Sequence, residues 1–117
     1  MSLTVGVQDG STGIVIAPCG ETDMATAPQL RKVIDEALAT TDGGVTLDLA
    51  GLTFCDSAGI SALMHGRREA DAKGVPYRVV NASDWITQIF DVTGVTELLT
   101  GKIDSATGQG DPQGSPG

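Results

Sequence analysis

The pattern of apolar and polar residues predicts strands that alternate with helices along most of the chain. Residues 3–7 (LTVGV) alternate, residues 14–17 (IVIA) form a short apolar run, and turn residues lie between them. We expect Pro18 to end this second strand. Residues 45–49 (VTLDL) and 77–80 (YRVV) predict two more strands, and residues 95–100 a last short extended segment.

Three stretches have the spacing of amphipathic helices. In the first, the apolar positions recur as on one helical face: Leu30, Val33, Ile34, Ala37 and Leu38. Thr26, with Gln29 three residues later, predicts a capping box at its start. The second helix is predicted over about residues 58–72 and ends at a lysine and a glycine. The third is predicted to begin at a Ser83 cap and to end at Gly94.

This order of elements predicts an α/β fold. Single helices between strands favour a mostly parallel central sheet with the helices packed on it, and the first hairpin adds one antiparallel edge strand. A chain of 117 residues is one domain, which we place at residues 1–100. Residues 101–117 hold five glycines and two prolines without apolar periodicity, so we expect a flexible tail.

Composition excludes several classes of partner. Seven basic residues against 15 acidic ones give a net charge of −8, which argues against binding nucleic acid or an anionic membrane surface. The first ten residues do not read as a secretory signal, and no apolar run approaches the length of a membrane span, so we expect a cytoplasmic protein. Two cysteines and one histidine make neither a zinc pattern nor a disulfide scaffold.

Polar residues gather where the second and third predicted strands end, at residues 20–23 (GETD) and 54–59 (FCDSAG). Ligands of parallel sheets bind at this edge. From the local sequence alone, Asp56 or Ser57 is first of all a helix cap, because both residue types are preferred there.

Three enzyme interpretations fail on these residues. A nucleophile elbow needs glycine where Cys55 stands, and His65 lies on the same helix as Ser57, not on another element. A phospho-accepting receiver domain built on Asp48 would need an acidic pair near the first strand, where only Asp9 is present. No phosphate-binding glycine loop matches. We therefore expect no enzyme, no cofactor and no metal site.

Four segments together resemble the STAS domain family: GETD, VTLDLAGLTFCDSAGISAL, YRVVNAS and QIFDVTGV. The resemblance covers residues 3–100 and is greatest to the small bacterial anti-sigma factor antagonists. It implies partner switching, in which the antagonist binds an anti-sigma factor that is also a serine kinase and thereby releases a sigma factor. The kinase then phosphorylates the antagonist with ATP, the antagonist dissociates, and a serine phosphatase resets it. Such a protein regulates transcription, for instance in a stress response or sporulation, and is a monomer when free.

Carried over by position, the resemblance makes Ser57 the phosphorylation site, with Asp56 beside it and Asp23 facing it. We expect the partner to bind a surface that comprises Glu21, Asp23, Asp56, Ser57, Ala58, Gly59, Ser61, His65 and Arg68. At a helix start a phosphate meets free N–H groups, whereas the nearby carboxylates oppose its charge. The competing interpretation of Asp23 is a loop carboxylate that satisfies backbone donors. His65 is expected on the surface, and Asp48 is interpreted as a strand-end carboxylate.

Three features depart from the family pattern. Thr22 replaces an aliphatic residue, which leaves the packing of its hydroxyl open. A glycine- and proline-rich tail stands where many members carry a final helix. Cys19 and Cys55 are interpreted as buried small residues or, alternatively, as a redox-sensitive thiol pair beside Ser57. An alternative function is that of a STAS subunit in a lipid transporter or stress-sensing complex, without a kinase switch.

Overall fold

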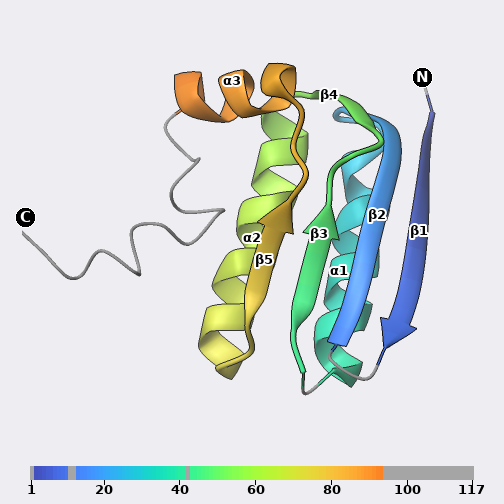
Figure 1. Ribbon diagram of the computed structural model, residues 1–117, viewed down its shortest axis with the longest axis vertical. Helices are drawn as coiled ribbons and strands as arrows, with labels where there is room; N and C mark the ends of the chain where they lie inside the picture. The colour runs from blue at the N-terminus through green and yellow to red at the C-terminus, as the bar shows by residue number, and fades with distance from the viewer. Residues whose placement is uncertain (1, 11–12, 42, 94–117) are drawn as a thin grey trace, which may run out of the picture.

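The computed structural model describes residues 2–10, 13–41 and 43–93 of the 117-residue chain. Five strands and three helices follow one another along these residues. The strands form one sheet, and helices lie behind it (Figure 1). Their bounds are β1 Leu3–Gly10, β2 Gly13–Thr22, α1 Ala27–Thr40, β3 Val45–Asp48, β4 Leu52–Cys55, α2 Ser57–Lys73, β5 Tyr77–Val80 and α3 Asp84–Thr93.

The sheet confirms the predicted α/β class. Its order is β1-β2-β3-β5, with β4 paired to β2 alone, and every pairing is parallel except that of β1 with β2. Helices α1 and α2 lie side by side behind the sheet, while α3 crosses its upper end and packs against β4 (Figure 1). The carboxyl ends of β2 and β4 therefore lie at the same end of the sheet, and the chain continues from them into α1 and α2.

Pro18 does not end the second strand, contrary to the prediction, because β2 continues to Thr22. The amide of Ile14 donates to the Gly44 carbonyl and that of Gly20 donates to the Gly51 carbonyl, so the N–H groups of the even-numbered residues of β2 point away from β1. Pro18 is one of these even-numbered positions. It lies after the last residue paired with β3 and before the first paired with β4, where no N–H is needed.

Strand β4 was not predicted. Its four residues, LTFC, follow β3 after a three-residue turn in which the Leu52 amide donates to the Leu49 carbonyl at 3.0 Å. This short strand can pair with β2 only because β2 extends beyond its last residue paired with β3. The apolar pattern along the chain does not show how far β2 extends. Both ends of β4, Leu52 and Cys55, are buried against the helices.

The helical faces agree with their predicted apolar spacing. Leu30, Ile34, Ala37 and Leu38 of α1 are buried, with Val33 half-buried beside them. The buried face of α2 is built largely from small residues, namely Gly59, Ala62, Gly66 and Ala70, together with Ile60 and Leu63. Small side chains let α2 lie close to the sheet, and Met64 is half-buried at the margin.

Gly66 shows how close this approach is. A β-carbon there would come within 2.6 Å of Tyr77 Oη and 2.8 Å of Ile34 Cγ2. The Tyr77 hydroxyl donates to the Leu63 carbonyl at 2.8 Å, so the tyrosine is anchored beneath the same turn of α2. The two contacts together fix the height of α2 above β5.

Two predicted helix ends are confirmed. The Ile86 amide donates to Ser83 Oγ at 3.2 Å at the start of α3, and Gly74 ends α2 in the left-handed conformation at a φ of 70°. The expected boundary at Gly94, the extended segment at 95–100 and the tail at 101–117 lie outside the described residues.

The capping box predicted for α1 is wrong. Thr26 precedes the helix but makes no side-chain cap bond, because its hydroxyl donates to the Glu21 carbonyl at 2.9 Å instead. Gln29 reaches away from the helix start, and its amide donates to the Leu3 carbonyl at 3.3 Å. The neighbouring strands thus compete successfully for both side chains.

Candidate functional site

The two polar segments meet at the carboxyl ends of β2 and β4. Thr22 and Cys55, the last residues of these strands, are paired in register, and Asp23 and Asp56 follow them directly. The Asp56 amide donates to the Thr22 carbonyl at 3.0 Å, which ties the two segments together. Parallel pairing therefore brings together two stretches that are more than 30 residues apart in the chain.

Asp56 is the cap of α2. Its Oδ1 accepts hydrogen bonds from the amides of Ala58 at 2.9 Å and Gly59 at 3.0 Å. This confirms the simpler of the two interpretations for Asp56 and leaves Ser57 exposed at the first helical position. The expectation that a phosphate on Ser57 would meet free N–H groups is wrong for those two amides, because the carboxylate already occupies them.

Asp23 also has a local structural role. Its Oδ1 accepts from the amides of Ala25 at 2.9 Å and Thr26 at 3.0 Å, and it lies 3.1 Å from Thr26 Oγ1. Partial desolvation raises the pKa of Asp23, but these hydrogen bonds from Thr26 and Ala25 outweigh it, so the pKa lies below the usual value. The carboxylate is therefore ionised at neutral pH and holds the turn between β2 and α1.

Thr22 forms the floor of the site. Its side chain is fully buried, and its hydroxyl donates to the Phe54 carbonyl at 3.3 Å, which answers the question of how this hydroxyl packs. Gly59 lies directly above, where a β-carbon would come within 2.8 Å of both Thr22 Cβ and Cys55 Sγ. Gly59 was expected on the partner surface, but it is buried and instead positions α2 against the sheet.

The thiol-pair hypothesis for Cys19 and Cys55 is wrong for a direct bond. Cys55 is buried beneath Gly59, whereas Cys19 is exposed and packs against Gly51. Cys55 is in register with Thr22, three residues beyond Cys19, which places the two cysteines about 10 Å apart along the strand. Burial raises the pKa of the Cys55 thiol, and the Asp56 carboxylate adds to this against a hydrogen bond with Thr22.

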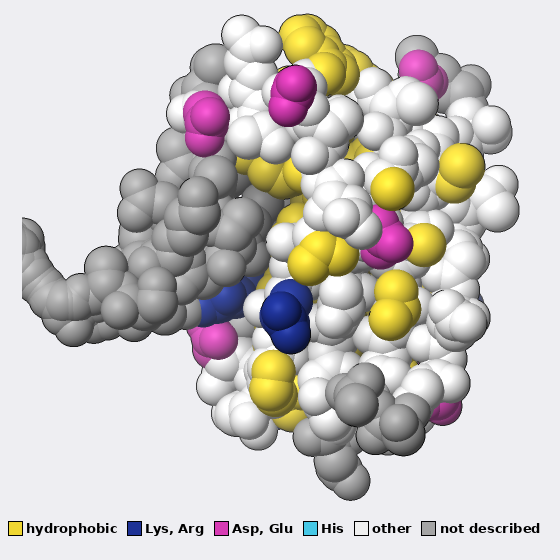
Figure 2. Space-filling view, in the orientation of Figure 1, with side chains coloured by type: hydrophobic (Ala, Val, Ile, Leu, Met, Phe, Trp, Pro, Cys, Tyr) yellow, Lys and Arg dark blue, Asp and Glu magenta, His cyan; other side chains and the backbone are white. Residues whose placement is uncertain are grey.

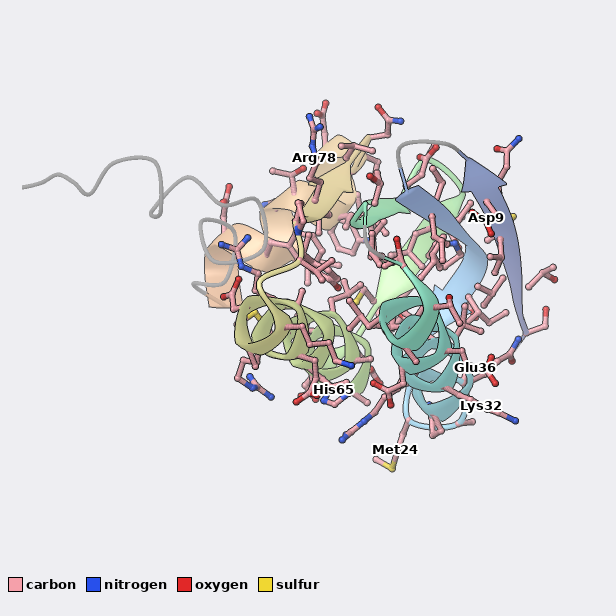
Figure 3. All side chains as sticks on the ribbon, turned by 90° about the horizontal axis from the view of Figure 1, so that it is seen from below. Asp9, Met24, Lys32, Glu36, His65 and Arg78 are labelled. Carbon is pink, nitrogen blue, oxygen red and sulfur yellow. The ribbon has the colours of Figure 1, made fainter. Side chains whose placement is uncertain are left out.

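A groove of about 470 Å³ separates the first turns of α1 and α2. We call it the docking groove, and it is lined by Met24, Ala27, Pro28, Arg31, Ala58, Ser61 and Ala62. Ala58 and Ser61 were expected at the partner surface. Met24 was missed, although it is 80% exposed and projects outward beyond α1 (Figure 3). An apolar residue in a predicted turn was the signal that could have found it.

His65 and Arg68 lie apart from this groove. The His65 side chain is only 15% exposed, and its Nε2 lies 2.6 Å from Asp35 Oδ1, so the expectation of a simple surface residue is wrong. It lies between α1 and α2 because the two helices pack side by side (Figure 3). Arg68 is exposed 11 residues after Ser57, roughly 16 Å along the helix axis.

Asp48 is the strand-end carboxylate that was expected. Its Oδ1 accepts from the Ala50 amide at 3.1 Å and from Asn81 Nδ2 at 3.2 Å. Asn81 has a φ of 60°, a conformation in which asparagine is favoured among non-glycine residues. The pair closes the turns after β3 and β5.

The electrostatic setting of the site is acidic. Asp56 directly precedes Ser57, Asp23 directly follows Thr22, whose carbonyl accepts from the Asp56 amide, and Glu21 is half-buried one residue before Thr22. On the face shown in Figure 2, some acidic side chains lie near the end that carries α3 and others lie at mid-height and at the lower edge, whereas the lysine and arginine side chains lie away from the α3 end. A phosphate added at this end would meet like charge.

Among residues 2–10, 13–41 and 43–93, no helix combines the length and apolar character needed to cross a membrane. Within the same ranges, no three side chains of histidine, cysteine, aspartate or glutamate are grouped so that they could hold a metal ion.

Known proteins resemble this chain over nearly its whole length. The family described as "Mlab, STAS domain" matches residues 5–100. The anti-sigma-B factor antagonist of Bacillus subtilis is 24% identical over 99 residues, which are 85% of this chain and 90% of that protein.

Solved structures of anti-sigma factor antagonists share the fold of this chain. An anti-sigma factor antagonist from Mycobacterium paratuberculosis superposes with a TM-score of 0.74 at 28% identity, over 91% of this chain and 92% of that one. The antagonist SpoIIAA in its unphosphorylated form gives a TM-score of 0.70 at 21% identity, over 92% and 100% of the two chains. A Bacillus SpoIIAA in its phosphorylated form gives 0.63 at 22% identity, over 79% and 85%.

Proposed function

Because this chain belongs to the STAS domain family, we propose that it is an anti-sigma factor antagonist switched by phosphorylation of Ser57. In this role it binds an anti-sigma factor that is also a serine kinase, and the sigma factor is released. Phosphorylation of Ser57 then ends the complex, and a serine phosphatase restores it. The relatives named as anti-sigma factor antagonists support the general kind of partner.

The observation that carries this proposal is the exposure of Ser57 on a rigidly held helix start. Asp56 caps α2, and the buried contacts of Gly59 with Thr22 and Cys55 fix the first turn against the sheet. Ser57 therefore reaches a kinase without local unfolding. A hydroxyl presented in this way suits a phosphoryl acceptor better than a nucleophile, because no histidine contacts it among the described residues.

The docking groove is the second part of the proposed partner surface. Its apolar lining, the exposed Met24 and the single cation Arg31 lie beside the exposed Ser57 and Ser61. An apolar partner side chain would be desolvated in the groove, while Ser57 lies at its margin on the same helix. Phosphorylation thus changes charge next to the contact without changing the contact itself.

The phosphate would act chiefly by repulsion and clash. It brings a charge of about −1.5 to −2 to a position next to Asp56, whose carboxylate already occupies the amides of Ala58 and Gly59. The fold has no need to rearrange, because the phosphate projects from an exposed side chain. Binding is lost because the partner meets a larger, more negative surface.

The experiment that tests this function is a phosphorylation assay with candidate anti-sigma factor kinases and ATP, followed by mapping of the phosphosite by mass spectrometry. We expect phosphate on Ser57 and none on a Ser57→Ala variant. Ser2→Ala is the matched control, since it removes an exposed serine hydroxyl outside the proposed partner surface and should leave phosphorylation intact.

Binding to the same kinases completes the test. Ser57→Asp should weaken the complex, whereas Ser57→Ala should keep it and make it insensitive to ATP. Equal affinity of wild type and Ser57→Asp would contradict the switch. Absence of binding to every kinase, with purification in a membrane complex instead, would favour a STAS subunit without a kinase switch.

A further inference from the structure

Strand β1 is an open edge of the sheet. It pairs with β2 on one side, and among the described residues no strand lies on its other side. The Glu21 amide donates to the Ser2 carbonyl at 3.2 Å, so the even-numbered residues of this segment are the ones that exchange hydrogen bonds with β2. The odd-numbered residues, which include Val5 and Val7, therefore direct their N–H and C=O groups away from the sheet.

The middle of the β1 edge consists of Val5, Gly6 and Val7. Within the part of the chain that the structure describes, no hydrogen bond ties the N–H or C=O groups of the two valines. The Leu3 carbonyl at the start of the strand differs, because it accepts a bond from the Gln29 side chain. A row of free donors and acceptors is a template on which another strand can pair.

The β1 edge lacks the features that usually protect an edge strand from pairing. Residues 3–8 (LTVGVQ) contain no charge and no proline, and β1 pairs with β2 in one continuous register without a bulge. The opposite edge strand, β5, has four residues, and one of them is the exposed Arg78. Strand β1, with eight residues, is therefore the edge at which the sheet can extend.

Apolar side chains accompany the free backbone groups. Val5 and Val7 face Pro18 and Ile16 across the strand pair, and both of these residues are fully buried. Val5 is half-buried, whereas Val7 is 56% exposed. A strand paired to this edge would bury the exposed valine surface as well as satisfy the backbone.

We propose that β1 pairs with β1 of a second copy of this chain, antiparallel about a twofold axis at Gly6. Val5 then faces Val7 of the second copy and Val7 faces its Val5, so each pair exchanges both N–H···O bonds and buries two β-branched side chains. A shift by one residue would oppose the outward-directed groups to groups already bonded to β2. The contact is self-complementary, as a twofold interface must be.

The charges near this edge favour a second copy. Each chain carries a net charge of −8, so two copies repel unless acidic side chains are few at the contact or are matched by cations. Asp9 would face Leu3 of the second copy, which keeps the two Asp9 carboxylates apart. Lys32 and Glu36 project from α1 on the side that carries β1 (Figure 3). The twofold turns the two α1 helices antiparallel, which brings Lys32 of one copy toward Glu36 of the other.

The dimer leaves the proposed partner surface open. Helix α1 lies between the β1 edge and the docking groove, and antiparallel pairing directs the two Ser57 side chains to opposite ends of the joined sheet. A single strand pair buries less than the roughly 1,200 Å² of a stable complex, so we expect a dissociation constant on the order of 100 µM. The chain is then a monomer when dilute, as the family resemblance implies, and a dimer when concentrated.

Sedimentation equilibrium of the free protein provides the first test. Wild type should change from monomer to dimer between about 10 µM and about 1 mM. Val7→Lys should weaken the dimer by about tenfold or more, because its ammonium group would lie between the joined strands. Gln88→Lys is the matched control, since it adds the same charge at an exposed position of α3, on the opposite side of the molecule from β1 (Figure 1), and should dimerise like wild type.

Disulfide cross-linking tests the register. In a Cys19→Ala background, Gly6→Cys should form an intermolecular disulfide in oxidised glutathione, because the twofold places the two positions about 4.5 Å apart at Cα. A β-carbon fits there, since its nearest neighbour lies at 3.7 Å. Gln8→Cys is the control on the same face of β1. Its twofold mate lies roughly 14 Å away, so it should not cross-link.

A protein that stays monomeric at the highest concentration would overturn the proposal. Equal dimerisation of Val7→Lys and Gln88→Lys, or equal cross-linking of the two cysteine variants, would overturn it as well. Circular dichroism shows whether each variant is folded, and if Val7→Lys is not, the cross-linking comparison decides. The phosphorylation switch takes no part in these experiments, so its failure would leave their outcomes unchanged.

Discussion

Gly59 of α2 lies directly on Thr22 of β2, so close that a β-carbon on the glycine would come within 2.8 Å of Thr22 Cβ. This contact places the first turn of α2 at a fixed height above the sheet. Ser57 and the cap residue Asp56 owe their positions to it, because they precede Gly59 in the same turn.

Gly59→Ala should therefore destabilise the protein and displace the helix start. The added methyl group meets Thr22 and Cys55, both buried, and overpacking of this kind costs about 1–3 kcal/mol. Urea unfolding gives the free energy of unfolding. Gly6→Ala is the control, since a β-carbon there meets its nearest neighbour at an ordinary 3.7 Å. Equal stability of the two variants would show that the first turn of α2 is not held by this contact.

Gly66→Ala should be destabilising by a similar amount for a related reason. Its methyl group would press on Tyr77 and Ile34. Tyr77→Phe separately removes the hydrogen bond to the Leu63 carbonyl and should cost about 1 kcal/mol. Combining the two substitutions should cost less than the sum of the single effects, because phenylalanine relieves the contact with the hydroxyl. Strict additivity in denaturant unfolding would contradict the shared contact.

Tyr77 also predicts a loss of stability in alkali. Burial raises its pKa, against a smaller opposing effect of Arg67, so the folded protein keeps the phenol neutral. The unfolded chain ionises near pH 10, and above that pH ionisation favours the unfolded state. The free energy of unfolding should thus decline more steeply above about pH 10 in wild type than in Tyr77→Phe. Parallel pH profiles of the two proteins would argue against a buried neutral phenol.

Asp56→Ala should weaken the helix start, whereas Asp56→Asn should largely preserve it. Alanine leaves the amides of Ala58 and Gly59 without their acceptor, at a cost of about 1 kcal/mol, while asparagine is an equally good cap. Amide hydrogen exchange of the first turn of α2 measures the effect directly. Slow exchange at these amides in Asp56→Ala would mean that another group caps the helix.

The lowered pKa of Asp23 predicts that the protein loses stability in acid. Its pKa is lower in the folded protein than in the unfolded chain, so its contribution to stability is present above about pH 4 and is lost as the pH falls through the folded value. Asp23→Asn should flatten the part of the stability profile below about pH 4, measured by thermal unfolding at each pH. An unchanged acid limb in the variant would assign the effect to other carboxylates.

Much of the site was predictable because its residues are close together in the chain. The cap at Asp56, the exposed Ser57 and the turn carboxylate Asp23 all act within a few residues, so local preference decides them. The capping box at Thr26 and Gln29 failed because both side chains found partners on strands β1 and β2. The half-buried position of His65 was unpredictable for the same reason, since its partner Asp35 lies 30 residues away.

By itself, the sequence determined the α/β class, the helical faces and the serine at a helix start, because periodicity, caps and turns depend on neighbouring residues. The tertiary structure decided which strands β2 joins, how closely Gly59 and Gly66 bring α2 to the sheet, and where the docking groove opens. Those features depend on distances between segments far apart in the chain, and packing of the whole core sets such distances.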